Sequence, residues 1–134
     1  MNRTLGLVPL GLLALLMATG VQAEPVPVGL AKWLKPLQVA EQRFEDGHLT
    51  IRMEKARVPS ELFTSVMANS ICRSILDNPK AWGNVEIRRV DIVNSFGVQG
   101  WYYDGPLRKD CQGLKDQSLQ TWAAGDFWDH VHQK

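Results

Sequence analysis

The sequence predicts a small α+β domain in which helices pack on an antiparallel sheet of about three strands. Three observations lead to this prediction. A long apolar helix is expected after Pro59, a two-stranded hairpin is expected before Asp104, and a cysteine stands near each end of this region, at Cys72 and Cys111. A sheet of this size needs the helices, and a disulfide, to be stable.

Residues 1–23 have the pattern of a secretory signal peptide. Arg3 is their only charge, an uncharged apolar run follows, and the segment ends in small residues at Val21-Gln22-Ala23. An uncleaved anchor is the alternative, but the run is shorter than the roughly 20 residues that span a bilayer. We therefore expect a single exported domain at residues 24–134, periplasmic or secreted, without a transmembrane anchor after cleavage.

The charge balance argues against nucleic acid as a partner. The chain has 15 lysines and arginines against 14 aspartates and glutamates, and loss of Arg3 with the signal peptide leaves 14 of each. A neutral domain has no overall field that attracts nucleic acid or an anionic membrane. Removing 23 of 134 residues leaves 111, enough for one domain with one modest core.

The two cysteines are expected to form one structural disulfide, because thiols in an oxidising compartment are usually paired. The bond between Cys72 and Cys111 would close a loop of about 40 residues and stabilise the fold by roughly 4 kcal/mol. A reactive cysteine is the alternative. Against it, the sequence contains no Cys-x-x-Cys motif and no histidine close to either cysteine.

The first expected element is an amphipathic helix that is kinked at Pro36 and reaches about Glu45. Apolar residues recur at helical spacing on both sides of the kink: Leu30, Trp33, Leu34, Leu37, Ala40 and Phe44. The stripe either caps the core or binds a membrane surface or a partner. Asp46-Gly47 then marks a turn, and residues 48–54 alternate between apolar and polar side chains, which predicts a half-buried strand.

The long central helix is expected between Ser60 and Asn78. Its buried stripe repeats every four residues and ends before a helix-stopping proline: Phe63, Met67, Ile71 and Ile75. Two strands follow, within residues 85–92 and 98–103, with turn-forming residues between them. A change in alternation at Arg88-Arg89 indicates a bulge. Gly100 indicates a bend or a close approach of another backbone.

The end of the chain is expected to be helical. A polar loop over residues 107–110 leads to Cys111, and helical spacing resumes from about Gly113 to a stop at Gly125. One further short turn is expected to contain Phe127, Trp128 and Val131.

No motif assigns catalysis, a metal or a cofactor. His130 and His132 form a His-x-His pair, but two ligands at a chain end are too few for a zinc site. The sequence has no Gly-x-Ser-x-Gly elbow, phosphate-binding loop or dinucleotide fingerprint. Scattered carboxylates could still converge in space, so the enzyme question stays open and leans towards a protein that is not an enzyme.

The strongest binding candidate is aromatic. Three consecutive rings, Trp101-Tyr102-Tyr103, stand on an expected strand, so at least one must face away from the others. With flanking cations they predict a binding patch of Trp101, Tyr102, Arg88 and Arg108. The alternative is that the rings fill the core, where aromatic residues are favoured in strands.

Several runs together resemble a small family of secreted proteins of Gram-negative bacteria without an established function: Ile71-Cys72-Arg73, Val90-Asp91-Ile92-Val93-Asn94, Gln99-Gly100-Trp101-Tyr102 and Cys111. The resemblance covers roughly residues 60–114. It implies an exported α+β domain with a disulfide and carries over no catalytic residue.

These observations favour a non-enzymatic exported binding protein whose partner is a protein or small molecule of the envelope or the medium. Two alternatives remain. One is a small envelope hydrolase whose site is assembled only in three dimensions. The other is an amphipathic envelope-associated helper that uses Leu30, Trp33 and Leu34.

Overall fold

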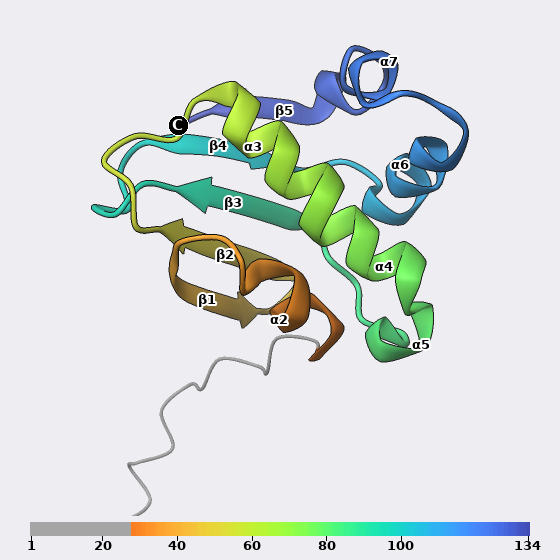
Figure 1. Cartoon of the computed structure of the whole chain (residues 1–134), viewed down its shortest axis with the longest axis horizontal. Helices are drawn as coiled ribbons and strands as arrows, with labels where there is room; N and C mark the ends of the chain where they lie inside the picture. The colour runs from red at the N-terminus through yellow and green to blue at the C-terminus, as the bar shows by residue number, and fades with distance from the viewer. Residues whose placement is uncertain (1–27) are drawn as a thin grey trace, which may run out of the picture.

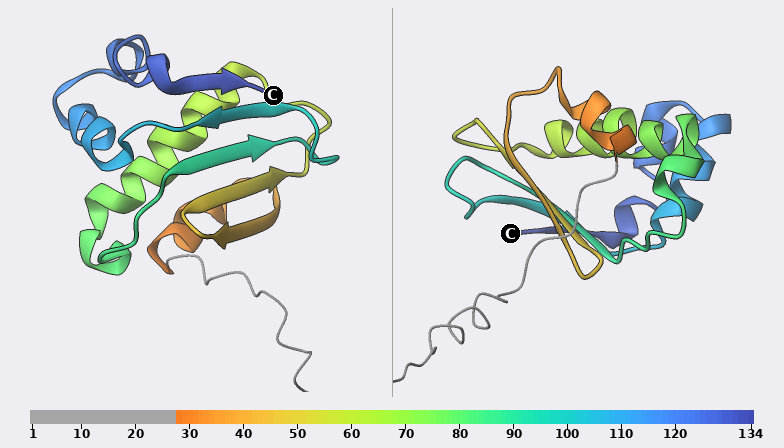
Figure 2. Two further views of the ribbon diagram at one scale, coloured as in Figure 1. Left: turned by 180° about the vertical axis from the view of Figure 1, so that it is seen from behind. Right: turned by 90° about the horizontal axis from the view of Figure 1, so that it is seen from below.

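A computed structural model describes residues 28–134 and shows a mixed α+β fold. The expected signal peptide at residues 1–23 lies outside the described residues. Five strands form one sheet in the order β1-β2-β3-β4-β5, and the helices cover one of its faces (Figures 1 and 2). The α+β class is confirmed, whereas the prediction of about three strands is too low. Strands β1 and β5 are the two that the sequence did not reveal.

The first two strands form a hairpin, β1 (Val39–Glu45) and β2 (His48–Met53). Asp46 and Gly47 connect them with φ angles of 47° and 78°, the left-handed values of a tight two-residue hairpin turn. The expected kinked helix up to Glu45 is therefore wrong beyond its first part, because only α2 (Val28–Leu34) is helical. The half-buried strand at residues 48–54 is confirmed, with alternate side chains of β2 buried.

A helical segment crosses from β2 to β3 (Arg89–Val93), and these two strands pair in parallel. The expected antiparallel sheet is therefore wrong at this pair, because a helical crossover between two neighbouring strands allows them to run in the same direction. It consists of α3 (Ser60–Val66), a π-helical part η1 (Met67–Cys72) and α4 (Arg73–Asp77), followed by the short α5 (Pro79–Trp82). A single long central helix is therefore not seen. The π-helical part ends at Cys72, where the helix surface meets the disulfide partner.

Strand β3 pairs antiparallel with β4 (Gly100–Tyr103), as the expected hairpin requires. A Cβ atom added to Gly100 would collide with the carbonyl oxygen of Ile92, so the expected close backbone approach is confirmed. The expected bulge at Arg88-Arg89 is not found, because β3 begins only at Arg89 and its pairing with β4 runs without a shift.

The last third of the chain forms short elements rather than one helix. They are α6 (Leu107–Gly113), the 3-10 turn η2 (Leu114–Asp116), α7 (Leu119–Ala123), the 3-10 turn η3 (Trp128–His130) and β5 (Val131–Gln133). The expected polar loop at residues 107–110 is helical instead, because Leu107 and Cys111 lie one turn apart and are both buried. Strand β5 pairs antiparallel with β4.

The core lies between the sheet and its helical cover. Leu30 and Leu34 of α2 belong to it, so this helix caps the core, and its two leucines are not available to a membrane in this fold. Aromatic residues from distant parts of the chain complete it, including Phe63, Trp122 and Phe127. None of the helices within residues 28–134 has the length and apolar character that a membrane crossing requires.

Candidate functional site

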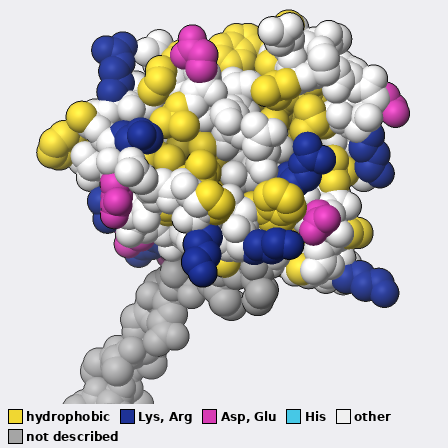
Figure 3. Space-filling view, viewed as in Figure 1, with side chains coloured by type: hydrophobic (Ala, Val, Ile, Leu, Met, Phe, Trp, Pro, Cys, Tyr) yellow, Lys and Arg dark blue, Asp and Glu magenta, His cyan; other side chains and the backbone are white. Residues whose placement is uncertain are grey.

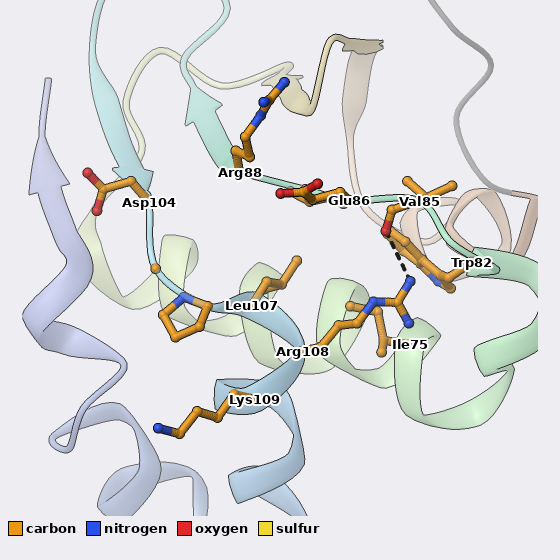
Figure 4. A pocket seen from close by; sticks show the side chains of 12 residues that line it. Ile75, Trp82, Val85, Glu86, Arg88, Asp104, Leu107, Arg108 and Lys109 are labelled. Atoms are coloured by element: carbon orange, nitrogen blue, oxygen red, sulfur yellow. Dashed lines mark hydrogen bonds between the residues drawn. The ribbon is translucent and has the colours of Figure 1, made fainter.

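A pocket of about 360 Å³ lies at the end of the sheet where β3 begins and β4 ends. Its two walls are segments that are distant in sequence, residues 82–88 and 104–109, and α4 also contributes (Figure 4). This volume lies in the lower part of the range of small-molecule pockets. The lining consists of Ile75, Trp82, Val85, Glu86, Ile87, Arg88, Asp104, Gly105, Pro106, Leu107, Arg108 and Lys109.

The apolar part of the lining is continuous with the core. Ile75, Trp82 and Leu107 are each buried, and each belongs to the core cluster. The indole nitrogen of Trp82 donates a hydrogen bond of 2.7 Å to the hydroxyl of Ser74, which fixes the orientation of the ring. The apolar surface of the pocket is therefore already formed, and a ligand need not order it on binding.

Arg108 joins the two walls. Its Nη2 atom donates to the carbonyl oxygens of Gly83 and Val85, at 3.0 and 3.1 Å, and Figure 4 shows the contact with Val85. The guanidinium stands on α6, whereas both carbonyls belong to the connection between α5 and β3. Arg108 thus shapes the pocket as well as placing a positive charge on its rim.

The rim carries more positive than negative charge. The cations are Arg88, Arg108 and Lys109, and the carboxylates are Glu86 and Asp104. Arg88 pairs with Asp46 at 2.9 Å, but the Asp46 side chain is 91% exposed, so solvent screens this ion pair strongly. Within the part of the chain that the structure describes, Lys109 has no hydrogen-bond or ion-pair partner. An anionic group can therefore reach a cation here without breaking a buried pair.

The disulfide holds one wall in place. Cys72 and Cys111 are bonded, with their Cα atoms 5.0 Å apart, which confirms the expected pairing. Cys111 lies on α6, one turn after Leu107 and Arg108. The bond therefore fastens the helix that carries the wall to the crossing helical segment.

A second polar cluster occupies the sheet face that no described helix covers. At its centre is Asp91 of β3, whose side chain is 2% exposed. Its two oxygens accept hydrogen bonds from His48 (2.8 Å), Arg89 (2.7 and 3.1 Å) and Lys134 (2.8 Å). Burial raises the pKa of Asp91, but these hydrogen bonds outweigh it and bring the pKa below its ordinary value.

Aromatic stacking extends this cluster towards β5. The Arg89 guanidinium lies 3.8 Å from the centre of the Tyr102 ring, and the His132 ring stacks on Tyr102 at 4.8 Å. His132 in turn contacts the Asp104 carboxylate at 3.0 Å. The cluster is closely paired throughout, so its main effect is to join β2, β3, β4 and the end of the chain.

The structure separates the four residues that were expected to form one binding patch. Arg88 and Arg108 both line the pocket. Trp101 lies on the helical face, where its indole nitrogen donates to the carbonyl of Val58 at 3.0 Å, and Tyr102 lies on the opposite face. Trp82 was not predicted to line a site, because it lies between the expected central helix and the first strand of the expected hairpin, where no pattern marks it.

The geometry offers little to nucleophilic or metal chemistry. His48 and Asp91 form a hydrogen-bonded pair that could transfer a proton, but Asp91 also forms ion pairs with Arg89 and Lys134. No hydroxyl among the described residues hydrogen-bonds to His48. His130 and His132 do not converge, since His130 packs edge-on against Tyr103. Residues 28–134 contain no group of three or more side chains that could hold a metal ion.

No protein-family model, curated protein or solved structure matches this chain. The resemblance to secreted Gram-negative proteins therefore stays a prediction.

Proposed function

We propose that the protein is a non-enzymatic exported binding protein and that the pocket beside α6 is its ligand site. The observation that carries the proposal is the combination of a preformed apolar lining, from Trp82 and Leu107, with cations on the rim. Such a site suits an apolar group that carries a negative charge, either on a small molecule or on an exposed segment of an envelope or extracellular protein.

The disulfide supports export, because such bonds persist in oxidising compartments such as the periplasm and the medium. It also supports the binding role. A rigid wall lowers the ordering cost of binding, and here the covalent bond lies within one helical turn of Arg108.

The proposal is tested with a probe of matching chemistry, the apolar sulfonate 1-anilinonaphthalene-8-sulfonate, added to the oxidised protein. Amide chemical shifts in a nitrogen–proton NMR spectrum should change around residues 82–88 and 104–109. The double substitution of Arg88 and Lys109 by alanine should weaken binding about tenfold, because two charge-assisted contacts are lost.

The matched control is Arg43→Ala on β1. This arginine is also exposed and in a solvated ion pair, but it does not line the pocket. Arg43→Ala should leave the affinity unchanged. Shift changes that spread over the surface without focusing on the pocket, or equal weakening by the control, would argue against this site.

A further inference from the structure

Two of the most exposed large apolar side chains lie together at the end of the sheet opposite the pocket. Phe96 and Val98 are 74% and 72% exposed, and both belong to the loop at residues 94–99 between β3 and β4. Leu119 and Trp128, the other exposed large apolar residues of the described chain, are each 39% exposed. Such exposure contributes nothing to the core, so packing does not explain these two residues.

The loop is held firmly although its tip is exposed. The Asn94 side chain, 4% exposed, accepts hydrogen bonds from the backbone nitrogens of Val98 and Gln99 at 3.0 and 3.1 Å, and donates to the carbonyl of Ala56 at 3.0 Å. The Gln99 amide binds both backbone groups of Val58, at 2.7 and 2.9 Å. The buried Asn94 amide and the partly buried Gln99 amide therefore hold the loop in a shape that presents its apolar side chains to solvent.

A basic loop lies beside this apolar one. The backbone nitrogen of Ser95 donates to the carbonyl of Lys55 at 2.8 Å, which places residues 54–58 next to residues 94–99, and both loops project from the same end of the sheet (Figures 1 and 2). Lys55 and Arg57 are exposed, whereas the loop has one acidic residue, Glu54. Arg57 has no hydrogen-bond or ion-pair partner among residues 28–134, and the Lys55 ammonium contacts only the neutral amide of Gln38.

The space-filling view shows the same arrangement. Apolar side chains project from the left edge of the molecule, where Figure 1 draws the loop between β3 and β4, and both basic and acidic side chains lie close by (Figure 3). The feature is convex, so it is suited to enter another phase or surface and not to enclose a ligand.

We propose that this end of the molecule docks on a bilayer that contains anionic lipid. Phe96 and Val98 would enter the interfacial region, while Lys55 and Arg57 would contact lipid phosphates. A protein partner is less favoured, because a stable protein interface needs about 800 Å² from each side, far more than two side chains supply. The attraction is local and does not require a net positive domain.

Docking of this kind fixes an orientation. The loop at residues 94–99 and the pocket lie at opposite ends of the β3–β4 hairpin, since the pocket is lined by Arg88 before β3 and by Asp104 after β4. The pocket would then open towards the aqueous compartment. Membrane docking does not depend on the pocket having a ligand, so either proposal can fail without the other.

The test is flotation of the exported protein with vesicles of phosphatidylcholine and phosphatidylglycerol in a three-to-one ratio. Mass spectrometry of the same sample identifies its amino-terminal residue. The double variant Phe96→Ser with Val98→Ser should partition about tenfold more weakly, since it removes the apolar contact. The double variant Lys55→Gln with Arg57→Gln should lose the preference for these vesicles over pure phosphatidylcholine.

The matched control is Leu119→Ser, which removes an exposed leucine from α7 and should leave partitioning unchanged. All of these positions are exposed, and unchanged thermal unfolding would show that the variants fold. If the wild-type protein does not bind the mixed vesicles, the membrane proposal is overturned, and the loop at residues 94–99 would contact a protein partner instead. Equal loss in Leu119→Ser, or none in the Phe96 and Val98 variant, overturns it as well.

Discussion

Trp101 and Tyr102 are neighbours on β4, and their side chains lie on opposite faces of the sheet. Trp101 packs 6.4 Å from Phe63 and 5.9 Å from Trp128, measured between ring centres, whereas Tyr102 stacks with Arg89 and His132. The alternation of side chains along a strand makes this separation unavoidable. One ring supports the helical cover, and the other belongs to the polar face.

This difference predicts unequal effects of substitution. Trp101→Ala should lower the free energy of unfolding by about 3 kcal/mol, because it leaves a cavity beside Phe63 and removes the hydrogen bond to Val58. Tyr102→Ala should cost only about 1 kcal/mol, from the lost contacts with Arg89 and His132. Urea unfolding followed by far-ultraviolet circular dichroism measures both. Equal losses would contradict the assignment of the two faces.

Replacing Cys72 and Cys111 together by alanine should lower the free energy of unfolding by about 4 kcal/mol, because the unfolded chain regains the freedom of a loop that spans 39 positions. Adding a reductant to the wild type should approach the same value, while the reductant should not affect the double variant. Urea unfolding with and without reductant gives the comparison. A double variant as stable as the oxidised wild type would show that the bond is dispensable.

Asp91 predicts a loss of stability in acid. Its folded-state pKa lies below the ordinary value of 3.8, so its stabilising effect is fully present above that value and disappears as the pH falls through the folded pKa. Asp91→Asn should cost about 2 kcal/mol at neutral pH, since Arg89 and Lys134 lose their ionic partner. The difference in the free energy of unfolding between the wild type and Asp91→Asn should become smaller below about pH 4. Urea unfolding at pH 3 and pH 7 tests this.

Glu86→Gln is the matched control for Asp91, because Glu86 is exposed and has no hydrogen-bond partner within the described chain. Its stability should equal that of the wild type at both pH values. The free energies of unfolding of Asp91→Asn and the wild type could also differ by the same amount at pH 3 and pH 7. In that case the charge of the carboxylate is not what stabilises the cluster.

Gly100 and Gly97 form a natural pair for testing close packing. Both have positive φ angles, but an added Cβ atom would collide with the Ile92 carbonyl only at Gly100, and at Gly97 it would meet nothing within 4 Å. Gly100→Ala should therefore cost about 3 kcal/mol and Gly97→Ala about 1 kcal/mol, the latter from backbone strain alone. Thermal unfolding ranks them, and the reverse order would contradict the close approach of β4 to β3.

Local patterns were informative where one face of an element is covered and the other is not. The alternation in β2 identified a strand because Leu49, Ile51 and Met53 are buried while their neighbours are not. The segment before Asp46 was taken for a helix because its apolar spacing also fits 3.6 residues per turn. Pairing with β2 decides its conformation, and that contact is not visible in the segment itself.

The pocket was only partly predictable. Arg88 and Arg108 are 20 positions apart, and the antiparallel pairing of β3 with β4 brings their segments together. The expected hairpin already implied that residues just before β3 and just after β4 are close. Nothing local indicated that Ile75 would join them, because its position depends on how the crossing helical segment packs over the sheet. Strand β5 has only three residues, too few for a recognisable pattern.

The parallel contact between β2 and β3 also determines how the chain can assemble. Each of the two hairpins, β1 with β2 and β3 with β4, closes through a short turn and can form from neighbouring residues. Pairing of β2 with β3 requires the whole intervening segment to fold back. This closure costs conformational entropy and slows folding. The bond between Cys72 and Cys111 joins this crossing segment to α6, so a chain in which the segment has not yet packed would leave both thiols open to wrong partners.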